Sequence, residues 1–165
     1  MKFGPIPVAN AAGAILAHAI TAGETRLRKA HRLTARDVEI LEKAGISEII
    51  AAVLDVGDLD ENEAATRLSQ VLETSNAAAR PASTGRVNFH AEAAGVFTVD
   101  KALIDALNTI DPSITIATLA DHSTVEQGQM VATVKIIPFA VAGALVDEAA
   151  ALSAARTAFV VHRFA

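Results

Sequence analysis

The sequence predicts an α+β fold with mixed or antiparallel sheets and three to four short helices. Segments with helical spacing of apolar residues and segments with two-residue alternation both occur, and they do not follow the strict order of βαβ proteins. The chain has 165 residues, a single-domain length at which roughly 70% of the unfolded surface becomes buried. Hydrophobic residues make up 52% but aromatic residues only 4%, so we expect small side chains and closely packed elements.

Short elements are expected near the N-terminus. Residues 13–20, GAILAHAI, are either a short strand or a buried helical turn, because eight residues do not decide between the two. His18 in the middle of this stretch is expected to be a hydrogen-bonded core or interface histidine. The polar stretch that follows places Arg26 and Arg28 on either side of Leu27, which is typical of an exposed strand or hairpin.

A first helix is predicted over residues 35–44. Thr34 is its expected N-cap, and Asp37 stands three residues later, as in a capping box. Gly45 suits the left-handed conformation that ends helices. Residues 46–53, ISEIIAAV, then predict a strand.

Two further helices are indicated by caps and apolar stripes. Asp60 with Glu63 repeats the capping signal before a second helix. The apolar stripe of this second helix consists of Ala64, Ala65, Leu68, Val71 and Leu72. A third helix is predicted over residues 99–110, with Thr98 or Asp100 as its cap.

The remaining segments predict strands, a loop and one more helix. Residues 74–84 have no periodicity and predict a surface loop. Strands are expected at 114–119, at 129–139 and at the end of the chain in AFVVHRF. The alanine-rich residues 140–158 predict a helix.

The stretch at residues 85–97 carries the main ligand-contact candidates. As a strand it places Arg86, Asn88, His90 and Glu92 on one face and apolar side chains on the other. This stripe either contacts a polar ligand or is the solvated face of an antiparallel sheet. Lys135, which is flanked by apolar residues, is either an anchor for an anion or the ion-pair partner of Glu92 or another acid.

Charge is distributed unevenly. The formal net charge of −5 disfavours nucleic-acid binding, which requires a cationic surface. Arg26, Arg28 and Arg32 belong to a run of five basic residues that contains no acid. This run is either a patch for an anionic ligand or a solvated turn.

Several classes of site find no support. The chain has no cysteine, no apolar run of transmembrane length and no signal-like N-terminus, so we expect a cytoplasmic protein without disulfides. Dinucleotide, phosphate-loop, hydrolase and zincin motifs do not occur, and no two histidines have a short metal-ligand spacing, so no metal site is predicted. Asp121 and His122 are expected to make local backbone bonds in a turn.

Five segments together resemble molybdopterin-binding proteins. Residues 27–53 resemble the segment that precedes the pterin-binding domain of molybdopterin molybdotransferases. The other four resemble the N-terminal portion of such proteins, some of which continue into a cytidylyltransferase-like domain. These four segments are GAILAHAI, DLDENEAA, GRVNFHAEAAG and GQMVATVKIIPFAV.

The resemblance implies an accessory domain in molybdenum cofactor biosynthesis or transfer. Its ligand would be molybdopterin or a nucleotide form of it, and its partner a following domain or a second copy of the chain. On this view residues 1–139 form the accessory domain, and residues 140–165 connect it to the next one. The family's Asp-Gly-Tyr-Ala and Thr-Gly-Asp-Glu motifs are missing, so no catalytic residue is transferred.

Two alternatives remain open at this stage. In the first, the chain is a small stand-alone enzyme in which Arg86 and Lys135 hold an anionic metabolite and His90 acts as acid or base. Alternatively, it is a purely structural interaction module.

Overall fold

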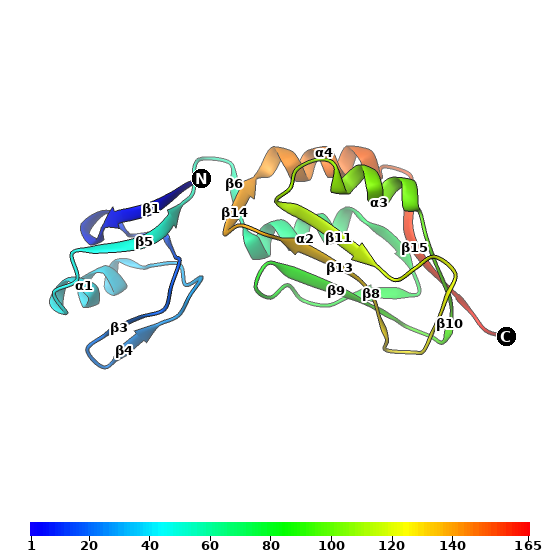
Figure 1. Cartoon of the computed structure of the whole chain (residues 1–165), viewed down its shortest axis with the longest axis horizontal. Helices are drawn as coiled ribbons and strands as arrows, with labels where there is room; N and C mark the ends of the chain where they lie inside the picture. Colours follow the sequence, from blue (N-terminus) through cyan, green and yellow to red (C-terminus); the bar gives the residue numbers. More distant parts are fainter. The chain divides into compact units, whose positions relative to one another are not determined.

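A computed structural model describes Met1–Ala165 and confirms the α+β class, with four α-helices and many short strands. The chain divides into two compact units, Met1–Asp58 and Leu59–Ala165 (Figure 1). Residues 140–165, expected to be a helix and a strand that connect to a following domain, contribute a helix and an inner strand to the second unit. The reason is burial, because Val146, Ala149 and Phe159 lie in the core of that unit.

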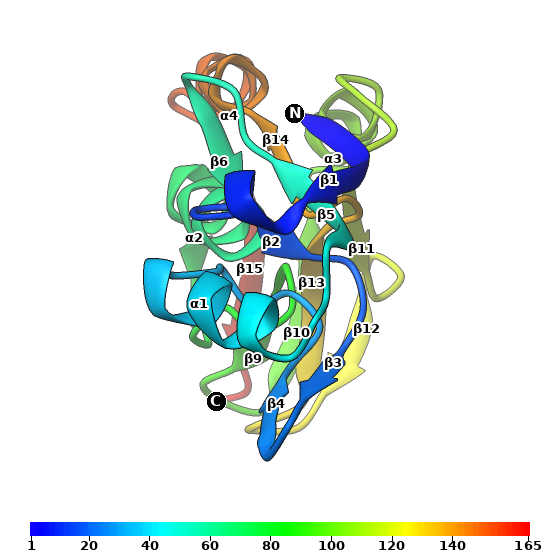
Figure 2. The same cartoon turned by 90° about the vertical axis from the view of Figure 1, so that its left-hand side faces the viewer.

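The first unit is built on a three-stranded antiparallel sheet. β5 (Glu48–Val53) lies between β1 (Lys2–Pro7) and β2 (Ile15–Leu16). Figure 2 turns this unit and its helix toward the viewer. Its core is a separate apolar cluster whose largest members are Leu16, Leu27, Leu33, Leu41 and Ile49.

Short elements complete the first unit. A 3₁₀ turn, η1 (Val8–Asn10), follows β1, and β3 (Ile20–Ala22) pairs with β4 (Thr25–Leu27) in the expected hairpin. Of residues 13–20, only β2 and the first residue of β3 are strand. His18 lies between β2 and β3 and is exposed, so its expected place in the core is wrong. The chain turns between β2 and β3, so Leu16 and Ala17 are buried in this stretch whereas His18 is not.

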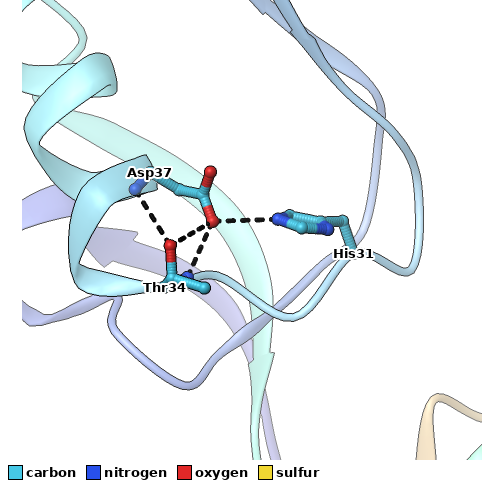
Figure 3. A network of polar contacts seen from close by, with 3 residues as sticks. All are labelled: His31, Thr34 and Asp37. Atoms are coloured by element: carbon cyan, nitrogen blue, oxygen red, sulfur yellow. Dashed lines mark hydrogen bonds and ion pairs between the residues drawn. The ribbon is translucent and has the colours of Figure 1, made fainter.

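The helix of the first unit, α1 (Ala35–Lys43), begins with the predicted capping box (Figure 3). Asp37 N donates to Thr34 Oγ1, and Asp37 Oδ2 accepts from Thr34 N at 2.8 Å and from Thr34 Oγ1 at 2.7 Å. His31 Nε2 lies 2.9 Å from the same oxygen. Burial opposes ionisation, but the hydrogen bonds from the Thr34 backbone, His31 and the Thr34 hydroxyl outweigh it and lower the pKa of Asp37 to about 2.

The second unit contains three helices and most of the strands. Its helices are α2 (Glu61–Val71), α3 (Lys101–Asn108) and α4 (Gly143–Ser153). None of the chain's helices has the length and apolar character needed to span a bilayer. The strands are β6 (Asp58–Asp60), β7 (Glu73–Ser75), β8 (Ala77–Ala79), β9 (Arg86–Ala91), β10 (Gly95–Val99), β11 (Ile114–Thr118), β12 (Ser123–Val125), β13 (Met130–Ile136), β14 (Ala140–Ala142) and β15 (Thr157–Arg163).

Two four-stranded sheets share one core in the second unit. Their strand orders are β12-β10-β15-β7 and β11-β13-β9-β8, and a two-stranded ribbon pairs β14 with β6. The sheets meet at Phe89 and Phe159, whose rings pack edge to face with centroids 5.3 Å apart. α2 packs against β9, β13 and α4, so one face of the β9 sheet is buried.

The predicted loop at 74–84 is wrong in its first half, because β7 ends at Ser75 and β8 spans Ala77–Ala79. β7 pairs in parallel with β15, and β8 pairs antiparallel with β9. Between them Asn76 has a φ of +54°, donates from Nδ2 to Val161 O, and accepts from Arg163 Nε. The chain thus passes from one sheet to the other at Asn76, and distant partners rather than local periodicity make both strands.

Predicted boundaries shift at the other helices. Within 99–110 only Lys101–Asn108 is helical, with Asp100 as the cap that accepts from Leu103 N. The expected helix at 140–158 is shorter because Ala140–Ala142 pair as β14. Asp60 caps α2 as predicted, accepting from Asn62 N and Glu63 N.

Candidate functional site

β9 presents a polar face to solvent and an apolar face to the core. Arg86, Asn88 and His90 alternate with Val87, Phe89 and Ala91, which are at most 3% exposed. Glu92 follows the strand, and its N–H donates to Asn76 O. The predicted two-residue alternation therefore holds through Ala91, with Glu92 just beyond the end of the strand.

Arg86 and Lys135 lie directly opposite each other on β9 and β13. Ile136 N donates to Gly85 O, so the next pair along, Lys135 and Arg86, is of the non-hydrogen-bonded kind. Side chains come closer in that kind of pair. Lys135 Nζ donates to Thr84 O, a neutral carbonyl, and makes no ion pair with Glu92, which follows the other end of β9.

The basic side chains of the second unit fall into two groups. This unit holds twelve acidic and seven basic residues, which leaves a formal charge of −5. Four of the basic side chains are bonded to partners, as Arg67–Glu63, Lys101–Asp105, Arg156–Asp100 and Arg163–Asn76. The other three, Arg80, Arg86 and Lys135, make no ion pair with any carboxylate.

These three cations lie on one face of one sheet. Arg80 N donates to Asn88 O, so Arg80 stands beside Asn88 and shares its face. No acidic residue lies on this face of β8, β9, β11 or β13. We call Arg80, Arg86, Asn88, His90, Thr133 and Lys135 the cationic face. Sequence reasoning missed Arg80, because it lay in a segment expected to be a loop.

A hydrogen bond at the centre of the cationic face orients its amide group. Thr133 Oγ1 donates to Asn88 Oδ1 at 2.7 Å. This bond engages the amide oxygen and leaves the two N–H groups of Asn88 Nδ2 as donors.

A shallow depression of about 320 Å³ lies at the end of the cationic face nearest His90. It brings together His90 and Glu92, which the sequence had singled out, with Arg80 and Gln127, which it had not. His90 Nδ1 is buried there without a hydrogen-bond partner. The lining residues are Ala78, Arg80, His90, Ala91, Glu92, Gln127 and Gly128.

The turn at 126–129 forms one wall of this depression. Gln129 N donates to Glu126 O, and Gly128 has a φ of +82°, a conformation that favours glycine. Gly128 N donates to Ala91 O, and Ala91 N donates to Gln129 O. These bonds fix the turn against the end of β9 and place Gln127 at the rim.

The basic patch expected from Arg26, Arg28 and Arg32 belongs to the first unit. Arg26 lies in β4, Arg28 directly follows it, and Arg32 forms an isolated bridge with Ile15. All three side chains are exposed. The structure therefore assigns the two groups of predicted anion-binding residues to different units.

Other polar residues have structural partners. His122 Nδ1 lies 3.0 Å from Asp121 Oδ2, and Asp121 Oδ1 accepts from Val99 N, a contact between distant segments rather than a local one. No group of three or more His, Asp or Glu side chains is placed to hold a metal ion.

Comparison with known proteins gives one match. A family model described as a domain of unknown function (DUF8806) matches residues 5–53, which lie inside the first unit. Neither a curated protein nor a solved structure matched the chain. The candidate site lies outside the matched residues.

Proposed function

We propose that the second unit binds a small anionic ligand on its cationic face, and that the chain is an accessory domain in molybdenum cofactor biosynthesis or transfer. The observation that carries the anionic ligand is the Arg86–Lys135 pair. Two like charges in a close cross-strand pair destabilise a sheet. An anion bound between them turns this repulsion into two attractive contacts.

The charge of the whole unit favours a small ligand over a polyanion. A unit with a formal charge of −5 repels long anionic chains such as nucleic acids. A single anionic group needs only the local field of Arg80, Arg86 and Lys135. Charge-assisted hydrogen bonds from these donors are stronger than bonds between neutral groups.

The donor set is compatible with a phosphate-bearing pterin, the ligand implied by the resemblance to molybdopterin-binding proteins. Arg86 and Lys135 suit its phosphate. Asn88 Nδ2, Glu92 and Gln127 supply the donors and acceptors that suit the N–H and carbonyl groups of a pterin ring. When bound, molybdopterin supplies sulfur ligands for molybdenum, and the residues of this chain bind and orient it.

Calorimetric titration of the whole chain with molybdopterin tests this proposal, with CTP and a neutral pterin in parallel. We expect saturable binding that weakens at least tenfold in Arg86→Ala and in Lys135→Ala. Ligand at 100 times its Kd should also stabilise the fold by about 2.7 kcal/mol.

Arg67→Ala is the matched control, because Arg67 is an exposed cation already paired with Glu63. It should leave the affinity unchanged. Absence of both heat and stabilisation with every ligand would contradict the proposal and favour an interaction module.

A further inference from the structure

The cation pair belongs to a row of four donors that crosses the sheet. Thr115 of β11 pairs with Lys135, Lys135 with Arg86, and Arg86 with Ser83. Residues paired across strands point to the same face. From β11 to the hairpin turn, the row therefore consists of a hydroxyl, an ammonium, a guanidinium and a second hydroxyl group. The backbones that carry neighbouring members are about 4.8 Å apart.

The two hydroxyl groups of this row are open to a ligand. Ser83 and Thr115 are both exposed, and neither side chain has a hydrogen-bond partner in the chain. Each stands next to a cation that itself lacks a carboxylate partner.

A strained hairpin turn holds Ser83 opposite Arg86. Ser83 and Arg86 exchange both backbone hydrogen bonds, so the loop consists of Thr84 and Gly85, with φ values of +50° and +68°. This is a type I′ geometry, in which a β-branched residue such as Thr84 is unusual. At Gly85 a Cβ would come within 2.8 Å of Ile136 O.

Contacts from α2 and β13 maintain this turn. Asn62 Oδ1 accepts from Gly85 N at 2.9 Å, Ile136 N donates to Gly85 O at 2.8 Å, and Lys135 Nζ donates to Thr84 O. An unfavourable conformation persists only where its surroundings hold it, and such positions cluster at ligand sites.

We infer that Ser83, Arg86 and Lys135 form a subsite for a phosphoryl group, in which the Ser83 hydroxyl donates beside the two cations. Thr115 stands three strand spacings, about 14 Å, from Ser83, too far for one phosphoryl group to accept hydrogen bonds from both. This inference rests on the proposed anion binding and adds the Ser83 hydroxyl to the two cations. A phosphoryl group carries close to two negative charges near neutral pH and has three acceptor oxygens, which matches two cations and a hydroxyl better than the single charge of a carboxylate does.

Titration of the whole chain with inorganic phosphate and with acetate at constant ionic strength tests the inference, using amide NMR shifts of β9 and β13. Wild type should bind phosphate more tightly than acetate. Ser83→Ala should lose about tenfold in phosphate affinity and less in acetate affinity, whereas Thr115→Ala should change both affinities little. Thr124→Ala, at an exposed threonine of β12 in the other sheet, is the control and should change neither affinity.

The outcomes separate this inference from the proposed function. If Arg86→Ala abolishes binding but Ser83→Ala binds phosphate as wild type does, the phosphoryl subsite is wrong and anion binding stands. If wild type binds neither phosphate nor any ligand of the calorimetric series, the proposed function fails, and the subsite fails with it. The thermal midpoint of each variant verifies that its fold is intact.

Discussion

The two units use their polar side chains in opposite ways. In the first unit, the His31–Thr34–Asp37 network joins one carboxylate to three donor groups at the start of α1 (Figure 3). In the second unit, Arg86 and Lys135 face each other without a counter-ion. The first cluster satisfies its charge within the chain and stabilises the fold, whereas the second has no carboxylate partner within the chain.

The pKa of Asp37 makes this difference measurable. A carboxyl group whose pKa falls from 3.8 to about 2 on folding adds stability when it is ionised. Nothing comparable neutralises the Arg86–Lys135 pair, which we expect to cost a little stability in the absence of an anion. We call the His31–Thr34–Asp37 network the closed cluster, and the cationic face together with Ser83 the open cluster.

Asp37→Asn should destabilise the first unit by about 2 kcal/mol at neutral pH, because it removes an ionised acceptor whose side chain is only 13% exposed. The folded-state pKa lies below the unfolded one. The wild-type advantage is therefore complete above about pH 4 and is lost as the pH falls toward 2. Native-state hydrogen exchange of α1 and β5 amides against pH measures this advantage.

Asp105→Asn is the control for this pH dependence. Asp105 is 63% exposed and pairs with Lys101, so its loss should cost well under 1 kcal/mol. An effect of Asp37→Asn on the exchange of α1 amides that equals the effect of Asp105→Asn on the exchange of α3 amides would show that the capping network is no more stabilising than a surface ion pair.

Local signals in the sequence predict the closed cluster well. A threonine followed three residues later by an acid indicates a capping box without reference to the rest of the chain, and the box at Thr34 and Asp37 is present. The two-residue alternation of β9 is another local signal, and the structure confirms it. His31, which completes the network, is missed because it precedes the helix and carries no spacing signal.

The open cluster could be predicted only in part. Arg86 and Lys135 were both candidates, yet they are 49 positions apart in the sequence, and their pairing depends on the register between β9 and β13. Arg80 and Ser83 were hidden in an alanine-rich segment whose strand character comes from pairing with β9. The division of the chain into two units at residue 58 depends likewise on which apolar faces pack against each other. A short segment of sequence does not contain that information.

Arg86→Glu should stabilise the second unit by roughly 0.5 kcal/mol while it abolishes anion binding. It places a carboxylate opposite Lys135 and converts a repulsive cross-strand pair into an attractive one. Hydrogen exchange of β9 and β13 amides measures the stability, and phosphate titration of the same sample measures the binding. A variant that is less stable than wild type would mean that the pair is not repulsive in the folded chain.

The smallest expected effect is the salt dependence of this repulsion. Arg86→Gln should be more stable than wild type by a few tenths of a kcal/mol in dilute chloride buffer, and the difference should vanish near 0.5 M salt because ions screen exposed charges. Low phosphate concentrations should reverse the order, since only wild type gains from a bound anion. In α1, whose Asp37 side chain is largely buried, exchange should change little over the same salt range. A constant difference at every salt concentration would indicate that Arg86 acts through packing of its aliphatic stem rather than through its charge.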